Sequence, residues 1–231
     1  MAKSRRKRPP HIPADLSTID GRQRAHAELL WGDHGLLRLR FSNLHHIADG
    51  MWRSNQPSPR QIRRHAAERD IKTIINLRGE STKGYFLLEE EACAAEGIAL
   101  INFQVFSRDT PTSSAVLQAS ELFQSIEYPA LMHCKSGADR AGLMSVLFKI
   151  AHKGQPVGDA MEQLSSKYLH IKQGKTGILD AFFEAAMNAG ADAPENFFKW
   201  VKSDYDRVAV KADFLRKQGR TLELDRLLGR E

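Results

Sequence analysis

The sequence has little cysteine and no long hydrophobic run, and each absence narrows the classes of protein that it can encode. It contains two cysteines in 231 residues, too few for a disulfide-stabilised scaffold and without the spacing of a zinc knuckle. No apolar run reaches the roughly 18–20 residues that span a bilayer, and no apolar signal segment follows the basic N-terminus. We therefore expect a protein of the reducing cytoplasm.

Acidic residues are missing from the segment that carries most of the net charge. The formal net charge is +6, and most of it comes from five clustered cations, Lys3, Arg5, Arg6, Lys7 and Arg8. We expect a basic arm over residues 1–34, partly disordered, that can contact an anionic surface. Since no nucleic-acid-binding module or interleaved aromatic residues accompany it, no specific nucleic acid is expected as a partner.

The sequence does contain 42% hydrophobic and 27% charged residues, a composition typical of a packed domain. Its hydrophobic pattern predicts strands that alternate with helices. The predicted strands cover residues 36–41, 51–53, 71–77, 98–105 and 129–133. The predicted helices cover residues 58–70, 86–96, 114–125 and 141–153. This alternation favours an α/β fold whose central mixed, mostly parallel sheet is flanked by helices.

The segment after Pro156 is predicted to be helical to the end of the chain. We expect one domain over residues 35–190 and a helical C-terminal extension over residues 191–231. In the extension, apolar residues recur every three or four positions and predict a single apolar stripe. The stripe comprises Phe198, Val201, Tyr205, Val208, Ala212 and Leu215.

The most informative segment joins a predicted strand to a predicted helix and reads His133-Cys134-Lys135-Ser136-Gly137-Ala138-Asp139-Arg140. In an α/β sheet, ligands bind at the carboxyl ends of the strands, and a loop that enters a helix directs backbone N–H groups at an anion. Arg140 offers a planar fork for two phosphate oxygens, and Gly137 permits a close backbone approach. Cys134 beside these groups is expected to exist largely as the thiolate. The segment therefore predicts an anionic nucleophile placed against a bound phosphoryl group.

This segment resembles the signature of the cysteine-dependent protein tyrosine phosphatase superfamily, above all its compact dual-specificity branch in bacterial form. Further likeness lies in residues 52–57, 75–78 and 172–180, so that the resemblance covers roughly residues 35–190. It implies a phosphocysteine on Cys134, a loop-orienting role for His133, and equatorial oxygens held by the Arg140 side chain and by the loop amides. These amides belong to Lys135, Ser136, Gly137, Ala138, Asp139 and Arg140. The resemblance implies neither a metal nor a diffusible cofactor.

The resemblance also implies an aspartate on a separate loop that protonates the leaving group. Asp109 follows a predicted strand and is the first choice for this general acid, and later for the base that activates water. Its alternative is an Asx turn before Pro111. Asp139, inside the loop, is the rival acid, as in a few lipid-directed relatives. Its alternatives are a structural bond to the neighbours of Arg140 and the repulsion of excess anionic charge.

The implied activity is phosphomonoester hydrolysis, with phosphotyrosine or mixed phosphoprotein substrates first. Lys135 adds a positive charge at the rim and also occurs in relatives that act on phosphoinositides or phosphatidylglycerophosphate. A phospholipid or inositol phosphate headgroup is therefore the second substrate class. A sulfurtransferase, which has no use for a bidentate Arg140, and a phosphoryl-binding module without turnover are the remaining alternatives.

Two residues near these motifs have more than one interpretation or depart from the family. Cys93 is either a small buried apolar residue or a partner for a protective disulfide with Cys134, as in some relatives. Ala141 stands where most relatives carry Ser or Thr, whose hydroxyl stabilises the departing thiolate. Its presence predicts slow breakdown of the phosphocysteine.

Overall fold

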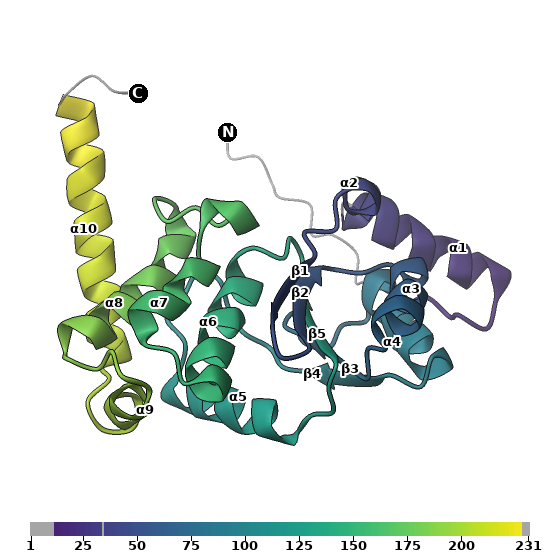
Figure 1. Ribbon diagram of the computed structural model, residues 1–231. Helices are drawn as coiled ribbons and strands as arrows, with labels where there is room; N and C mark the ends of the chain where they lie inside the picture. Colours follow the sequence, from purple (N-terminus) through teal and green to yellow (C-terminus); the bar gives the residue numbers. More distant parts are fainter. Residues whose placement is uncertain (1–11, 34, 228–231) are drawn as a thin grey trace, which may run out of the picture.

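The computed structural model describes residues 12–33 and 35–227, and its centre is a five-stranded sheet in the order β1-β2-β5-β3-β4 (Figure 1). The strands are β1 (His45–Ala48), β2 (Met51–Asn55), β3 (Thr73–Asn76), β4 (Ala99–Asn102) and β5 (Ala130–Cys134). β1 is antiparallel to β2, and all other neighbouring strands are parallel. The predicted α/β class with a mixed, mostly parallel sheet is therefore confirmed.

Helices cover both faces of this sheet, α3 and α4 on one side and α5 and α6 on the other (Figure 1). The longer helices are α1 (Ile19–Ala27), α2 (Gly35–Arg40), α3 (Pro59–Arg69), α4 (Gly84–Ala95), α5 (Ser113–Ser125), α6 (Asp139–Lys153), α8 (Ile178–Asn188), α9 (Pro194–Ser203) and α10 (Arg207–Leu227). The shorter ones are η1 (Glu28–Gly32), α7 (Val157–Ala160), η2 (Met161–Gln163), η3 (Ser166–Tyr168) and η4 (Lys175–Gly177). The parallel strands need such helical crossovers, and both sheet faces are buried as a result.

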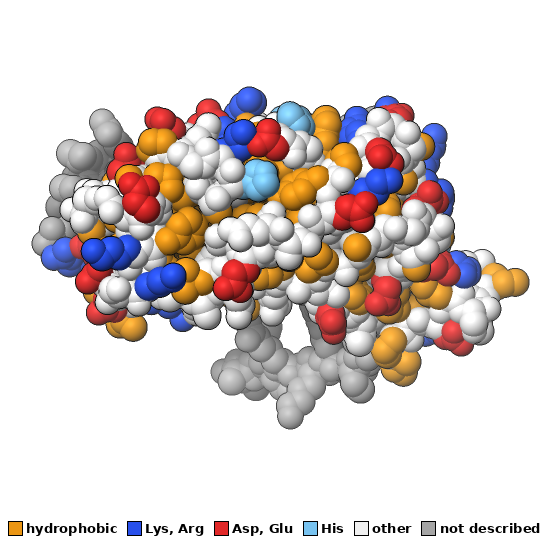
Figure 2. All heavy atoms as spheres, turned by 60° about the horizontal axis from the view of Figure 1, so that its bottom comes forward, with side chains coloured by type: hydrophobic (Ala, Val, Ile, Leu, Met, Phe, Trp, Pro, Cys, Tyr) orange, Lys and Arg blue, Asp and Glu red, His pale blue; other side chains and the backbone are white. Residues whose placement is uncertain are grey.

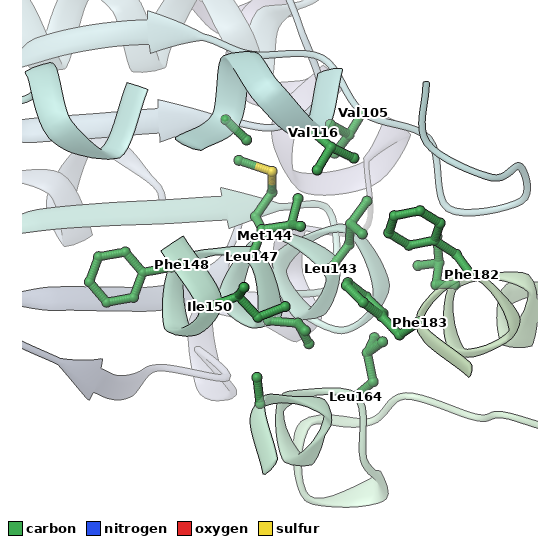
Figure 3. Packing of buried hydrophobic residues seen from close by; sticks show 14 of the residues in the cluster. Val105, Val116, Leu143, Met144, Leu147, Phe148, Ile150, Leu164, Phe182 and Phe183 are labelled. Atoms are coloured by element: carbon green, nitrogen blue, oxygen red, sulfur yellow. The ribbon is translucent and has the colours of Figure 1, made fainter. Parts of the chain in front are cut away.

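Helix α6 is the central helix of the molecule. All residues from Ala141 to Ile150 are buried, which is the pattern of a helix enclosed on every side. Figure 3 shows its side chains between Val116 of α5 and the phenylalanines of α8, with Leu143 close to Phe183. The first turn of α6, where the candidate loop ends, is therefore held in a close-packed core that permits little displacement.

Local signals in the sequence set several helix ends. Ser58 forms the N-cap of α3, because its hydroxyl accepts from the N–H of Gln61 while the Gln61 side chain accepts from the N–H of Ser58. This reciprocal pair is a capping box. Gly154, which follows the last residue of α6, has φ of +61°, a left-handed conformation that glycine adopts without strain.

The predicted edge strand over residues 36–41 is wrong, because residues 35–40 form helix α2. The helix is held by a contact outside the hydrophobic pattern. The Arg38 side chain folds back onto Asp33, where its Nη2 donates to Oδ2 at 2.7 Å and its Nη1 donates to the backbone carbonyl. Both side chains are buried, so their pairing decides the local structure against the partial alternation.

The predicted single apolar stripe of the C-terminal extension is also wrong. Helix α9 ends at Ser203, and α10 begins in a new direction at Arg207 and projects from the body of the molecule (Figure 1). As a result Val208 is 76% exposed and Leu215 is 54% exposed, whereas Val201 on α9 is buried. Because α9 and α10 have different axes, residues spaced three or four apart across their junction do not lie on one face.

The N-terminal part of the described chain lies against α4. Ala25 of α1 and Leu29 of η1 are buried with Leu88 of α4, and Arg22 pairs with Glu91 at 2.6 Å. The basic cluster between Lys3 and Arg8 lies outside the described residues.

Charged side chains of both signs are interspersed with hydrophobic ones on the face shown in Figure 2. None of the helices within residues 12–33 and 35–227 is both long and apolar enough to cross a membrane.

Candidate active site

The candidate nucleophile ends the central strand of the sheet. Cys134 is the last residue of β5, which lies between β2 and β3, and its register partner on β2 is Asn55. The loop that follows leads directly into α6. The carboxyl edge of a parallel sheet, where neighbouring strands end together, is the usual ligand site of such folds. The structure therefore brings residues 134–140 to the place that the sequence pattern predicts for them.

Gly137 allows the loop to pass close to β2. Its φ is +75°, and a Cβ built on it would lie 2.7 Å from the backbone nitrogen of Asn55 and 2.7 Å from the backbone carbon of Ser54. Neither backbone group can move aside cheaply within a sheet. Both the left-handed conformation and the close approach therefore require glycine here.

Arg53 of β2 holds this loop from behind. Its Nη2 donates to the carbonyl oxygens of Gly137 at 2.8 Å and of Ala138 at 2.9 Å, while Nη1 donates to that of Gln163 at 2.8 Å. The guanidinium also lies 4.2 Å from the ring centre of Tyr168. The carbonyls of Gly137 and Ala138 therefore face Arg53, on the side of the loop away from any anion that its N–H groups would bind.

The charge of Arg53 also acts on the nucleophile. Burial lowers the pKa of Arg53 to about 10, opposed by its attraction to Cys134, and the side chain stays positive at neutral pH. The resemblance of residues 52–57 to the family includes this arginine, but no local pattern indicates that its side chain reaches the loop. Only the sheet pairing of β2 with β5 brings the two together.

Arg140 differs from the other arginines around the site. Its side chain is partly exposed, and among the described residues no group forms a hydrogen bond or an ion pair with its guanidinium. Arg53, Arg38 and Arg78, by contrast, are each bonded to protein acceptors. Arg140 thus has its donors available for an oxyanion from outside the protein.

His133 lies on the buried side of the candidate nucleophile. Its Nε2 is 2.6 Å from Oε1 of Glu89 on α4, although the two groups are not aligned as a hydrogen bond, and both side chains are fully buried. The other Glu89 oxygen accepts from the amide of Gln56 at 2.9 Å. Among the described residues neither ring nitrogen of His133 forms a hydrogen bond, so its orienting role stays a prediction of the resemblance.

A second charged cluster reaches the rim of the loop and centres on Asp33. Both oxygens of Asp33 accept from Arg78, at 2.7 and 2.8 Å. Arg38 donates to one of them at 2.7 Å, and Nζ of Lys135 lies 3.5 Å from the other. Burial raises the pKa of Asp33, but the hydrogen bond and charge of Arg78 outweigh burial and leave it below its ordinary value. The single carboxylate of Asp33 therefore lies against three cationic side chains beside the loop.

Asp139, the rival acid, is bonded inside the protein. Its Oδ1 lies 2.8 Å from Nδ1 of His170, whose Nε2 lies 2.7 Å from Oδ2 of Asp180 on α8. Asp180 belongs to the stretch 172–180 that resembles the family, whereas His170 was not predicted to belong to the site. The sequence shows that these residues are polar, but it does not show that they contact one another in the fold.

Asp109, the first-choice acid, follows β4 and faces the C-terminal extension. Its carboxylate pairs with Nη2 of Arg207 at 2.5 Å and with Nζ of Lys211 at 3.0 Å. A shallow hollow of about 370 Å³ lies here, lined by residues 106–109 and Arg207. Burial raises the pKa of Asp109, but the bond to Lys211 and the charges of both cations outweigh burial and lower it. Within the described chain, Asp109 has no hydrogen bond or ion pair to residues 134–140.

The two cysteines are both free and lie in different apolar clusters. Cys93 packs with Ile62 and Ile74 on the α3–α4 side, and Cys134 belongs to the larger cluster around α6. Burial raises the pKa of the Cys93 thiol to about 12. A thiol so protonated attacks a disulfide or sulfenic acid poorly, which favours a packing role for Cys93.

With this geometry in place, residues 44–185 match the family described as the DSP-PTPase phosphatase fused to NAD+ kinase. The match covers more than half of the chain and includes the loop from Cys134 to Arg140. The chain belongs to this family, and with it to the cysteine-dependent protein tyrosine and dual-specificity phosphatase superfamily. It is a phosphatase of that superfamily.

Solved structures share its fold. P. aeruginosa TpbA aligns with a TM-score of 0.53 and 18% identity, over 65% of this chain and 89% of that chain. TpbA in complex with pTyr aligns with the same TM-score and identity, over 65% and 88%. The catalytic core of the PP-IP phosphatase SIW14 from S. cerevisiae aligns with a TM-score of 0.50 and 16% identity, over 64% and 93%. No curated protein matches the chain significantly.

Proposed function

We propose that the protein hydrolyses phosphomonoesters through a phosphocysteine on Cys134, with phosphotyrosine or mixed phosphoprotein substrates as the first class. One observation carries the proposal: Cys134 and Arg140 bracket a loop in which Arg53 holds the carbonyls of Gly137 and Ala138, and the Arg140 guanidinium has no hydrogen bond or ion pair within the described part of the chain. This arrangement leaves a nucleophile, loop amides and a bidentate donor for one tetrahedral anion. The fold shared with TpbA, which has been solved with pTyr, supports the phosphotyrosine class.

In the first step the thiolate of Cys134 attacks phosphorus. An S–P bond forms, the P–O bond to the leaving group breaks, and the leaving oxygen takes a proton from an aspartic acid. Arg140 and the loop amides hold the three equatorial oxygens, on which charge is spread in the transition state. In the second step water attacks phosphorus, the aspartate takes its proton, and the S–P bond breaks to restore the thiolate.

The cluster around Asp33 favours a second substrate class, the headgroups of phospholipids or inositol phosphates. Arg38, Arg78 and Lys135 share one carboxylate, which leaves an excess of positive charge at the rim of the loop. Such an excess attracts substrates that carry more than one phosphate. SIW14, which shares the fold, is a PP-IP phosphatase.

A substrate panel tests both classes. We expect the purified chain to hydrolyse p-nitrophenyl phosphate, and its kcat/KM on phosphotyrosine peptide, phosphoserine peptide, inositol phosphates and phosphatidylglycerophosphate vesicles ranks the classes. Cys134→Ser should abolish hydrolysis while tungstate binding persists, because the amides and Arg140 hold the anion and only the sulfur attacks. Cys93→Ser is the matched control and should retain full activity. Steady turnover by Cys134→Ser would show that another residue is the nucleophile.

A further inference from the structure

A buried histidine connects the candidate loop to helix α8. His170, in the segment between η3 and η4, has a side chain that is 1% exposed, and each of its ring nitrogens is within 2.8 Å of a carboxylate oxygen. One carboxylate is that of Asp139, the residue before Arg140, and the other is that of Asp180. The three residues form a continuous link from the start of α6 to α8.

This geometry fixes the charge of the ring. A neutral imidazole carries a single N–H, so one of its two contacts would set a lone pair against a carboxylate oxygen, whereas an imidazolium donates to both. Burial lowers the pKa of His170, but the hydrogen bonds to Asp139 and Asp180 and the charges of both outweigh burial and raise it to about 9. At neutral pH the ring is therefore positive.

The other charged groups around this link act on its carboxylates. Arg53 of β2 attracts Asp139 from the sheet side, and Lys172, which follows His170 in the chain, attracts Asp180. Both are cations, so positive charge flanks the link beside each of its carboxyl groups.

We propose that His170, in its protonated form, is a positioning residue for oxyanion binding by the loop. It ties Asp139 to α8 and so holds the first turn of α6, from which Arg140 and the last loop amides face the anion. This role rests on the proposed function and leaves the chemical steps to Cys134 and its acid. It also uses one oxygen of Asp139 in a structural bond, in line with the structural alternative for that residue rather than with its role as rival acid.

Loss of the proton from His170 has two effects on the loop. One of the two hydrogen bonds is lost, so Asp139 or Asp180 is released. In addition, two carboxylates remain without their shared cation beside a site for a dianion, and like charges at this range repel. Both effects weaken the binding of a tetrahedral anion as pH rises through the pKa of His170.

The test measures tungstate affinity by calorimetry in the Cys134→Ser protein between pH 7 and 9.5, a range that ends below the pKa of about 10 of Arg53. Tungstate remains a dianion over this range, and the serine removes the titration of the thiol. We expect constant affinity at neutral pH and a decline in affinity that begins at a break near pH 9. Adding His170→Gln should weaken binding about tenfold at pH 7 and abolish the break. Adding Asp180→Asn should move the break to lower pH, because His170 loses one of the two carboxylates that raise its pKa.

His152→Gln is the matched control, since His152 also lies near a carboxylate, 3.9 Å from Asp49, at the far end of α6. It should leave both affinity and break unchanged. If the pH dependence of tungstate affinity keeps its break in the His170→Gln variant, the proposal is overturned. It is also overturned if the break stays at the same pH in the Asp180→Asn variant. The second result is sufficient by itself if the glutamine variant does not fold. These outcomes differ from a failure of the proposed function. In that case the unmodified chain would hydrolyse no aryl phosphate, and the Cys134→Ser protein would bind no tungstate.

Discussion

The guanidinium of Arg207 lies 2.5 Å from the carboxylate of Asp109, so the first residue of α10 ties down the loop that carries the first-choice acid. The contact is reinforced on both sides. Nε of Arg207 donates to the carbonyl of Thr110 at 2.8 Å, and the hydroxyl of Tyr205 donates to that of Pro111 at 2.8 Å. The C-terminal extension therefore fixes the position of the loop that carries Asp109.

Removing the ion pairs of Arg207 and Lys211 with Asp109 should change the pH dependence of the reaction. Arg207 and Lys211 hold the pKa of Asp109 below its ordinary value, which favours the carboxylate over the proton-donating form. In the double variant Arg207→Met, Lys211→Met the pKa of Asp109 rises, so its acid form persists to higher pH. If Asp109 is the acid, the falling limb of kcat on substrates with poor leaving groups moves to higher pH. Arg216→Met, farther along α10, is the control. If the falling limb of the pH profile of kcat stays in place in the double variant, Asp109 is not the general acid.

The choice between the two candidate acids can be made from leaving-group dependence. Asp109→Asn should reduce kcat by about two to four orders of magnitude on alkyl phosphates, whose leaving groups need a proton. The loss should shrink on phosphates of acidic phenols, which depart unaided. Turnover of a series of substrates of rising leaving-group pKa measures this directly. If Asp139→Asn shows the dependence and Asp109→Asn does not, the acid lies within the loop.

Gly137→Ala should disable the loop. The alanine would be strained at φ of +75°, and its Cβ would meet the backbone of Ser54 and Asn55 at 2.7 Å. We expect a loss of more than about 1 kcal/mol in the free energy of unfolding together with a large loss of tungstate affinity. Gly190→Ala separates the two causes, because Gly190 has the same φ of +75° with nothing within 4 Å of its Cβ. That variant should lose stability and keep its affinity; unchanged affinity in Gly137→Ala would contradict the close approach.

Ala141→Ser should speed the breakdown of the phosphocysteine. The hydroxyl one turn along, that of Ser145, donates to the carbonyl of Ala141 at 2.6 Å and so is already engaged. A hydroxyl at position 141 would supply one charge-assisted hydrogen bond to the departing thiolate, worth roughly 1.5–3 kcal/mol, or about ten- to a hundredfold in rate.

Rapid mixing with an aryl phosphate provides the measurement. The natural sequence should show a burst of phenol followed by slow turnover, and Ala141→Ser should remove the burst and raise the steady rate. Ser145→Ala is the control and should keep the burst. Absence of a burst in the natural sequence, with no gain from the serine, would mean that another group stabilises the thiolate.

The sequence by itself determined the features that depend on near neighbours in the chain. The strand that ends at Cys134, the loop and the helix that begins beside Arg140 lie within some twenty consecutive residues, and strand and helix periods are visible over such windows. The capping box at Ser58 and the left-handed Gly154 are likewise set within three residues. The family, the α/β class and the candidate nucleophile all follow from signals of this kind.

Only the tertiary structure decided which side chains surround the loop. Arg53 reaches Gly137 across 84 positions of sequence, and Arg207 reaches Asp109 across 98. Contacts of this separation depend on which strands pair and where helices dock, and they leave no period in the sequence.

The same reason explains what was predicted wrongly. The alternation over residues 36–41 was outweighed by the buried pairing of Arg38 with Asp33, and the apolar stripe after Phe198 was divided by a change of helix axis. A local sequence pattern indicates the secondary structure that a segment favours in isolation. A buried charged side chain, in contrast, needs a partner, and the tertiary fold decides which residue that partner is.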